Sequence, residues 1–259
     1  MIRTFPPAER EVLETGLKRL KLRRLRESLD ELNELALEEE PSYLDFIAYI
    51  VEQEVIAREE TRRQKRLKAA RFPFLRTLDG FDFGFQTSVR RQTILDLAQL
   101  DFVERRENLV LLGPPGVGKT HLAIALGVEA VNAGYRVMFS TVHDLTDRLY
   151  KALADDTVTQ TMNRILRHEL TILDELGFLE LGQTGSDFLF QLVAKAYEKR
   201  SLILTSNLDF SEWGDLFDKP ATAAAVLDRL LHHAHVISLK GDSYRVRHRL
   251  TPPQQPEDS

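Results

Sequence analysis

The sequence predicts an α/β fold in which helices cover a five-stranded parallel sheet, with a small all-α domain in front of it. From about residue 76, short apolar runs alternate with amphipathic stretches, which is the pattern of strands alternating with helices. The first seventy residues instead carry leucines at helical spacing. The expected strands are Leu109–Leu112, Arg136–Ser140, Leu170–Leu173, Leu202–Thr205 and Val236–Leu239.

Two helices are expected in the N-terminal region. Its leucines recur at spacings of three and four, which places them on one helix face until Pro41 ends the helix. Ser42, with Asp45 three residues later, resembles a capping box that opens the second helix. The two apolar stripes are Leu22, Leu25, Leu29 and Leu32, and then Leu44, Ile47, Val51 and Val55.

The chain divides into three expected parts. Residues 1–75 form a helical partner-binding domain and linker. The linker pattern continues past this boundary over Leu78–Phe85, where Gly80 and Gly84 break helix. Residues 76–250 form the α/β domain, and residues 251–259 are a polar tail.

Composition and charge narrow the classes of protein. The chain has 259 residues, a net charge of −5 and no cysteine, so disulfides and cysteine-ligated zinc are excluded. It shows no signal peptide and no apolar run near the ~18 residues of a membrane helix, so a cytoplasmic protein without a membrane partner is expected. The acidic balance argues against binding nucleic acid by bulk charge, although local basic patches remain.

A complete P-loop pattern follows the first expected strand. Its glycines allow successive backbone N–H groups to wrap a phosphate, and the helix that begins near Lys119 points its positive end at that phosphate. Lys119 is expected to reach the β- and γ-phosphates of ATP, and the Thr120 hydroxyl to ligate Mg²⁺. The predicted nucleotide-binding residues here are Gly113, Pro114, Pro115, Gly116, Val117, Gly118, Lys119, Thr120 and His121.

Two further strands end in residues suited to ATP hydrolysis. Asp174 and Glu175 stand at the carboxyl end of an expected parallel strand, where α/β sheets place their ligands. Asp174 is expected to hold Mg²⁺, and Glu175 to orient and deprotonate the attacking water. Asn207 ends another strand and is placed to contact the γ-phosphate or that water.

Other residues of this region are less specific. Spacing alone gives Arg229, on an expected helix over Ala221–His233, no clear preference between a functional and a surface role. His232, His233 and His235 suggest a metal site, but no carboxylate or cysteine accompanies them in the sequence, so zinc is not expected.

Taken together, these motifs resemble the IstB family, the ATPase helper proteins of insertion-sequence transposition, which are AAA+ P-loop proteins related to the DnaC helicase loaders. The resemblance covers nearly the whole chain. The segments most specific to this family are Glu212–Gly214, Leu227–His233 and Gly241–Arg245. Only about twenty residues follow the last expected strand, too few for the full C-terminal lid of many AAA+ proteins.

The resemblance implies a function and further site residues. It implies an ATPase that is stimulated by duplex DNA, assembles on it as a ring or filament of identical subunits, and assists a cognate transposase. Arg229 matches the family's arginine finger, which acts on a neighbouring subunit's ATP, and Arg245 matches its sensor-2 arginine. An initiator-type insertion maps to about His143–Arg167, with candidate DNA contacts at Arg148, Lys151, Arg164 and Arg167.

Three alternatives remain open. A DnaC-like loader would share the ATPase core but deliver a replicative helicase through its N-terminal domain. A small-molecule phosphotransferase is disfavoured by Glu175 and by the strand between the P-loop and Asp174 in the chain. A passive DNA-binding scaffold is disfavoured by the intact set of Lys119, Asp174, Glu175 and Asn207.

Overall fold

A computed structural model describes residues 6–178, 180–244 and 246. The chain divides into two compact units, Met1–Lys65 and Arg66–Ser259. The expected boundary near residue 75 lies after this division, because Ala70 is buried in the core of the second unit and Phe72 packs 6.3 Å from Phe139. The sequence-predicted polar tail lies outside the described residues.

The first unit contains more helices than the sequence indicated. The first expected helix is divided into three: α1 (Pro7–Arg19), α2 (Arg23–Glu27) and α3 (Leu29–Glu38). The break after α1 occurs at Lys21, whose φ of 58° is left-handed and incompatible with a continuing helix.

The second expected helix is present as α4 (Tyr43–Ala70). One bond of the predicted capping box is present, because the Asp45 amide donates to Ser42 Oγ at 3.2 Å, and the Asp45 carboxylate accepts from the Ser42 hydroxyl at 2.6 Å. Within the first unit, the buried Glu54 carboxylate of α4 accepts hydrogen bonds from the amides of Arg24 (3.0 Å) and Leu25 (3.3 Å). Glu54 thus satisfies the free N–H groups at the start of α2.

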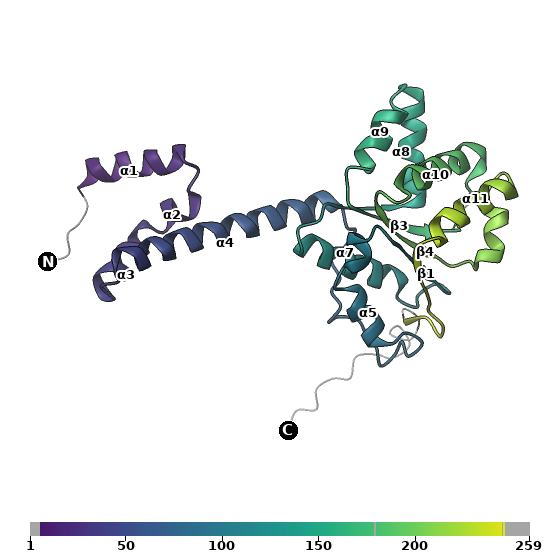
Figure 1. Ribbon diagram of the computed structural model, residues 1–259, viewed down its shortest axis with the longest axis horizontal. Helices are drawn as coiled ribbons and strands as arrows, with labels where there is room; N and C mark the ends of the chain where they lie inside the picture. The colour runs from purple at the N-terminus through teal and green to yellow at the C-terminus, as the bar shows by residue number, and fades with distance from the viewer. Residues whose placement is uncertain (1–5, 179, 245, 247–259) are drawn as a thin grey trace. The chain divides into compact units, whose positions relative to one another are not determined.

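The second unit is built on a five-stranded parallel sheet, as the sequence predicted (Figure 1). The strand order is β2-β3-β4-β1-β5 and every neighbouring pair is parallel. The strand that separates β1 from β3 in the sheet is β4, whereas β2, which lies between them in the chain, is at the edge. The strands are β1 (Asn108–Leu112), β2 (Val137–Thr141), β3 (Leu170–Leu176), β4 (Ser201–Ser206) and β5 (Ala234–Ser238).

Helices cover both faces of the sheet. Alternate residues of β1 belong to two different apolar cores, Leu109 and Leu111 to one and Val110 and Leu112 to the other. The first core contains α5 (Arg91–Leu97), α6 (Asp101–Glu104) and α7 (Lys119–Asn132). The second contains α8 (Val142–Ala154), α9 (Val158–Ile165), α10 (Gly182–Ala196), the 3₁₀ helix η1 (Phe210–Leu216) and α11 (Pro220–Leu231).

None of the helices in the described part of the chain is long and apolar enough to span a membrane.

Candidate active site

The P-loop connects β1 to the amino end of α7. Gly113 has a φ of 141°, and a Cβ atom there would lie only 2.0 Å from the Leu239 carbonyl oxygen. At Gly116, where φ is 85°, a Cβ atom would lie 2.1 Å from Ser243 Oγ. Only glycine fits these positions, because they combine a left-handed backbone with close approach of the segment that follows β5.

The charged and polar groups of the P-loop lie where a phosphate would be held. The Lys119 ammonium donates to the carbonyl oxygens of Gly113 (2.5 Å) and Pro114 (2.8 Å), so it lies folded over the loop. Thr120 Oγ1 donates to Asp174 Oδ1 at 3.0 Å. A buried carboxylate beside a hydroxyl is an oxygen donor set that suits Mg²⁺, so these residues fit the cofactor that the sequence predicts.

Asp174 and Glu175 have contrasting environments. Asp174 is 3% exposed and its Oδ1 also accepts a hydrogen bond from Thr205 Oγ1 at 2.5 Å. Glu175 is exposed and has a left-handed backbone with a φ of 63°. Both residues line a cavity of about 600 Å³ together with Thr120. One carboxylate is therefore fixed inside the protein, while the other faces a space that a water molecule can enter.

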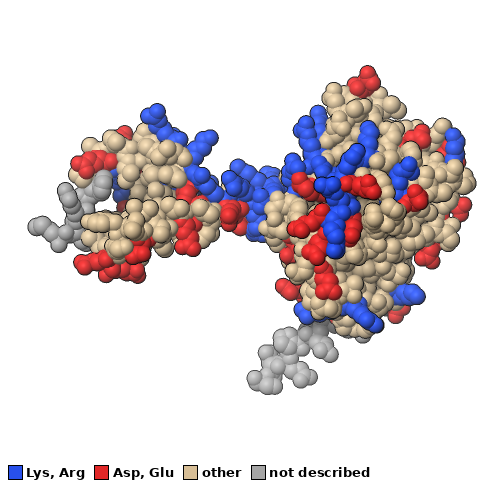
Figure 2. Space-filling view, viewed as in Figure 1, with Lys and Arg blue, Asp and Glu red and all other residues tan. Residues whose placement is uncertain are grey.

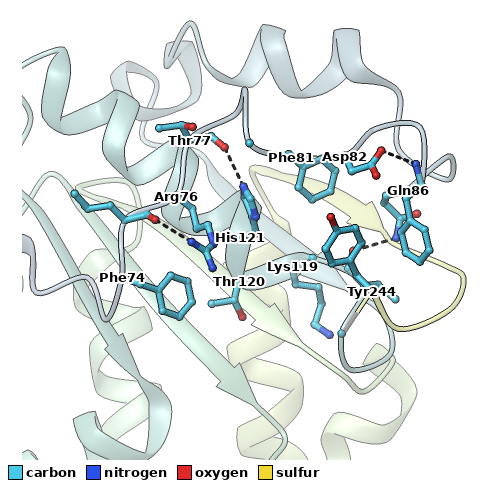
Figure 3. Close-up of a pocket in the computed structure, with 16 residues that line it drawn as sticks. Phe74, Arg76, Thr77, Phe81, Asp82, Gln86, Lys119, Thr120, His121 and Tyr244 are labelled. Atoms are coloured by element: carbon cyan, nitrogen blue, oxygen red, sulfur yellow. Dashed lines mark hydrogen bonds between the residues drawn. The ribbon is translucent and has the colours of Figure 1, made fainter. Parts of the chain in front are cut away.

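A second cavity, of about 480 Å³, adjoins the P-loop on the side of the segment that precedes α5 (Figure 3). The Gln86 side chain donates to the Val117 carbonyl at 3.0 Å, and the Phe81 ring packs edge-on against His121 at 5.2 Å. Phe74, Phe85 and Tyr244 add aromatic surface to the lining. Sequence reasoning treated this segment as a linker, and its cluster of aromatic residues was the signal that could have assigned it to the site.

His121 joins the P-loop helix to this segment. Its Nε2 lies 2.9 Å from the Thr77 carbonyl oxygen, as the dashed line in Figure 3 marks. Burial lowers the pKa of His121 below its ordinary value of 6.5, the hydrogen bond to Thr77 opposes this, and the nearby Arg76 lowers the pKa further. The folded environment of His121 therefore favours the neutral form of its imidazole.

This environment predicts a pH dependence of stability. Because the folded-state pKa of His121 is depressed, its stabilising contribution is present above pH 6.5 and is lost as the pH falls through the lower folded value. The melting temperature of the nucleotide-free protein should therefore fall more steeply between pH 7.5 and 5.5 than that of His121→Gln, whose side chain does not titrate. An equal change of melting temperature with pH in the two proteins would contradict the depressed pKa of His121.

The predicted residues outside the P-loop are not all brought together. Asn207 is exposed just after β4, where its Oδ1 would lie 3.4 Å from a Cβ atom at Gly177. Arg229 is half-buried on α11, donates to the Ala225 carbonyl and lies 5.3 Å from the centre of the Phe190 ring. Neither residue is among the described residues that line the two cavities. Arg245 lies outside the described residues.

The four candidate DNA contacts fall into two groups. Arg148 and Lys151, one turn apart on α8, line the same cavity as Asp174 and Glu175. Burial lowers the pKa of Arg148, as does the neighbouring Arg71, while Asp144 opposes the shift. Arg164 and Arg167 are exposed at the end of α9 and just beyond it. Figure 2 shows basic side chains gathered below α8 and α9, interspersed with carboxylates.

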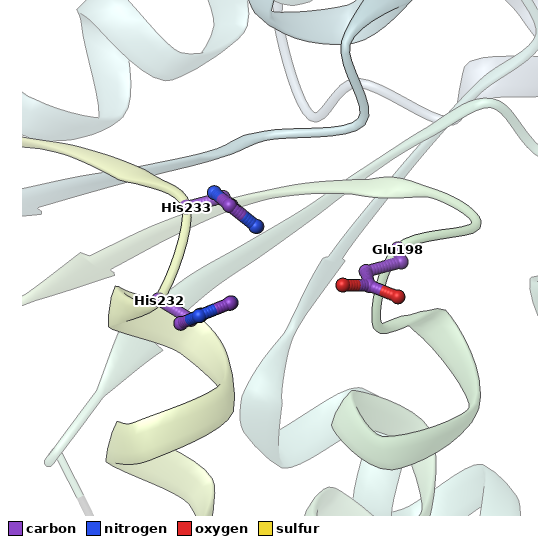
Figure 4. A group of neighbouring side chains, drawn as sticks. All are labelled: Glu198, His232 and His233. Atoms are coloured by element: carbon purple, nitrogen blue, oxygen red, sulfur yellow. The ribbon is translucent and has the colours of Figure 1, made fainter.

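In the structure, a carboxylate lies close to two of the histidines that follow α11. Glu198 comes close to His232 and His233, with one possible ligand atom from each within 4.8 Å of the others (Figure 4). The sequence did not indicate this neighbour, because Glu198 follows α10 and reaches the histidines only through the packing of α10 on α11. All three side chains are exposed, and the Tyr197 hydroxyl already lies 2.7 Å from Nδ1 of His232, so we assign no metal to this group.

Comparison with known proteins identifies the family. A model described as IstB-like ATP binding protein matches residues 15–252. The chain is 44% identical over 235 residues to an ATP-binding protein of insertion sequence IS21 from Pseudomonas aeruginosa, and this alignment covers 91% of this chain and 89% of that protein. It is 39% identical over 217 residues to an ATP-binding protein of insertion sequence IS5376 from Geobacillus stearothermophilus, and this alignment covers 84% of this chain and 86% of that protein.

Solved structures give the fold. The crystal structure of a DnaC helicase loader aligns with a TM-score of 0.53 at 23% identity, over 63% of this chain and 96% of that chain. At this level of identity the likeness shows a shared fold, the P-loop AAA+ core that the sequence predicted. The family match rests on the sequence itself and covers both structural units: the chain belongs to the IstB-like ATP-binding proteins of insertion sequences.

Proposed function

We propose that this protein is a DNA-stimulated ATPase that assembles on duplex DNA and assists the transposase of an insertion sequence. The observation that carries the proposal is the cluster of Thr120, Asp174 and Glu175 beside a complete P-loop in a chain of this family. The names of its relatives, which associate them with insertion sequences, favour transposition over helicase loading.

The chemistry assigned to the site follows from its geometry. The P-loop amides and Lys119 bind the phosphates, and the cavity beside Phe81 and Gln86 receives the base. Thr120 and Asp174 hold Mg²⁺, which when bound neutralises charge on the phosphates. Glu175 is the general base, because its exposed carboxylate lines a cavity that water can enter and that it shares with Thr120 and Asp174. Asn207 positions that water or the γ-phosphate from the end of β4.

The placement of Arg229 supports completion of the site between subunits. Arg229 is half-buried, its guanidinium lies 5.3 Å from the centre of the Phe190 ring, and it is not among the described residues that line the two cavities beside the P-loop. An arginine in this position serves a neighbouring molecule's ATP if the subunits assemble side by side. The sensor-2 role of Arg245 is proposed on the family resemblance alone.

The N-terminal unit has an exposed apolar surface that is suited to binding a protein partner. The apolar stripe of α4 is not covered by the rest of that unit, since Leu44 is 79% exposed, Ile47 56% and Val51 55%. A contiguous apolar helix face of this kind is typical of interaction sites. We assign it to the cognate transposase or to a second ring of subunits of this same protein.

ATP-driven assembly should control DNA binding. In a single subunit of net charge −5 the proposed contacts with DNA are Arg148, Lys151, Arg164 and Arg167, whereas an assembly adds these contacts along one duplex. We therefore expect apparent affinity for duplex DNA to rise by about tenfold or more with ATP relative to ADP, and to fall steeply with salt. A fluorescence titration with ATP, with ADP and without nucleotide, at two salt concentrations, measures both effects.

Two charge reversals provide the control for this titration. Arg164→Glu removes one of the proposed contacts, whereas Arg91→Glu changes an exposed arginine on α5, outside the proposed set. Only the first should weaken binding and reduce its salt dependence. Equal affinity in all three nucleotide states would contradict control by ATP, and equal effects of the two reversals would contradict the proposed contacts.

A further inference from the structure

The pairing of β3 with β4 is irregular at the two site carboxylates. Leu173 is opposite Leu204 and Leu176 is opposite Ser206, so Asp174 and Glu175 on β3 face the single residue Thr205 on β4. This is a β-bulge, in which one strand carries an extra residue and its ladder of backbone hydrogen bonds is interrupted. Bulges redirect side chains, and here the left-handed Glu175 turns outward while Asp174 stays buried.

The hydroxyl of Thr205 occupies the interruption. It donates to Asp174 Oδ1 at 2.5 Å and accepts a hydrogen bond from the Glu175 amide at 3.0 Å. Thr205 is 1% exposed, so no solvent replaces these contacts if the hydroxyl is removed. One side-chain atom thus fixes both the carboxylate that contacts Thr120 and the backbone from which Glu175 projects.

We propose that Thr205 is a positioning residue for ATP hydrolysis, acting through Asp174 and Glu175 by holding the bulge closed. This inference rests on the proposed function, because it concerns the same site. The Thr205 hydroxyl, and not the bulk of the side chain, fixes the positions of Asp174 and Glu175. The outward direction of Glu175 and the fixed position of Asp174 should therefore be lost together.

The test replaces the hydroxyl at nearly constant volume. Thr205→Val removes it, Thr205→Ser retains it without the methyl group, and Thr205→Ala lacks both and serves if the valine variant does not fold. Thr171→Val is the matched control, because Thr171 is also a buried threonine of this sheet, at 2% exposure, and lies on β3 away from the bulge.

Three measurements report on the site. In the nucleotide-free protein, hydrogen exchange at the Glu175 amide should be about tenfold faster in Thr205→Val. Nucleotide affinity without Mg²⁺ should stay within about twofold of wild type, while the Mg²⁺ concentration that half-saturates the complex rises several-fold. The value of kcat should fall by about 10- to 100-fold with little change in KM. Thr205→Ser should recover most of each effect, and Thr171→Val should show none.

The outcomes separate this inference from the proposed function. A serine variant as impaired as the valine or alanine variant, or exchange and Mg²⁺ dependence unchanged in Thr205→Val, would overturn the role of the hydroxyl. Absence of ATP hydrolysis by the wild-type protein would instead overturn the proposed function. The exchange measurement on the nucleotide-free protein would still decide whether Thr205 holds the bulge.

Discussion

Glu175→Gln should bind Mg-ATP with near wild-type affinity while its turnover falls by about 100-fold or more. Glutamine preserves the size of the side chain and its capacity for hydrogen bonds but cannot accept a proton from water. The substitution should also leave the bulge intact, because the contact of Glu175 with Thr205 is made by its backbone amide. Steady-state phosphate release, together with binding of a fluorescent ATP analogue, measures the two quantities separately.

Lys119→Ala provides the contrast. It removes the ammonium that lies over the P-loop carbonyls, so nucleotide binding itself should weaken. If Glu175 is the base, the glutamine variant should also remain longer on DNA in the presence of ATP than wild type, since the bound state is not consumed. Wild-type turnover by Glu175→Gln would remove Glu175 from the role of base.

A mixture of Arg229→Ala and Lys119→Ala proteins should hydrolyse ATP faster than either variant alone. The ATPase activity of Arg229→Ala should fall by about 1000-fold or more through loss of the finger, and that of Lys119→Ala should fall through loss of phosphate binding. In a mixed assembly, the intact P-loop of an Arg229→Ala subunit can face the intact arginine of a Lys119→Ala subunit. Activity measured across mixing ratios on DNA should pass through a maximum.

The control mixture combines Lys119→Ala with Glu175→Gln. Both of these residues serve the ATP of their own subunit, so no arrangement of the two variants creates a complete site. Activity from the control mixture equal to that from the Arg229 mixture would show that the gain does not come from pairing an intact P-loop with a neighbour's arginine. Lack of recovery in the Arg229 mixture, with both proteins folded and bound to DNA, would exclude action on a neighbouring subunit.

The sheet could be predicted from the sequence because buried parallel strands are short continuous apolar runs. All five expected strands are present, and the P-loop, Asp174 and Glu175 lie at the carboxyl ends where the strand pattern placed them. The helical N-terminal region was less accessible. Its apolar stripe is consistent with one helix or several, and the left-handed residue Lys21 carries no signal in its type, since lysine rarely adopts that conformation.

The rest of the site depends on contacts between residues distant in sequence. Thr205 carries a hydroxyl within an apolar strand. Its proposed role can be recognised only from the structure, in which the extra residue in β3 places Thr205 opposite Asp174 and Glu175. Gln86 similarly has no local pattern that connects it to Val117. The pattern of apolar residues in the sequence predicts which residues are buried, but it does not specify the register of strand pairing or the partners of buried polar groups.

The position of β5 in the sheet has a consequence for synthesis of the protein. β1, whose five residues are all buried, has β4 and β5 as its neighbours, and both follow it in the chain. At 5–20 residues per second, the ribosome takes roughly 6 to 25 s to proceed from residue 113 to residue 239. During that interval the apolar strand has at most one of its two neighbours, and the P-loop lacks the wall formed by Leu239. We therefore expect nucleotide to stabilise chains that already include β5 more than shorter ones, in which β1 is less shielded from aggregation.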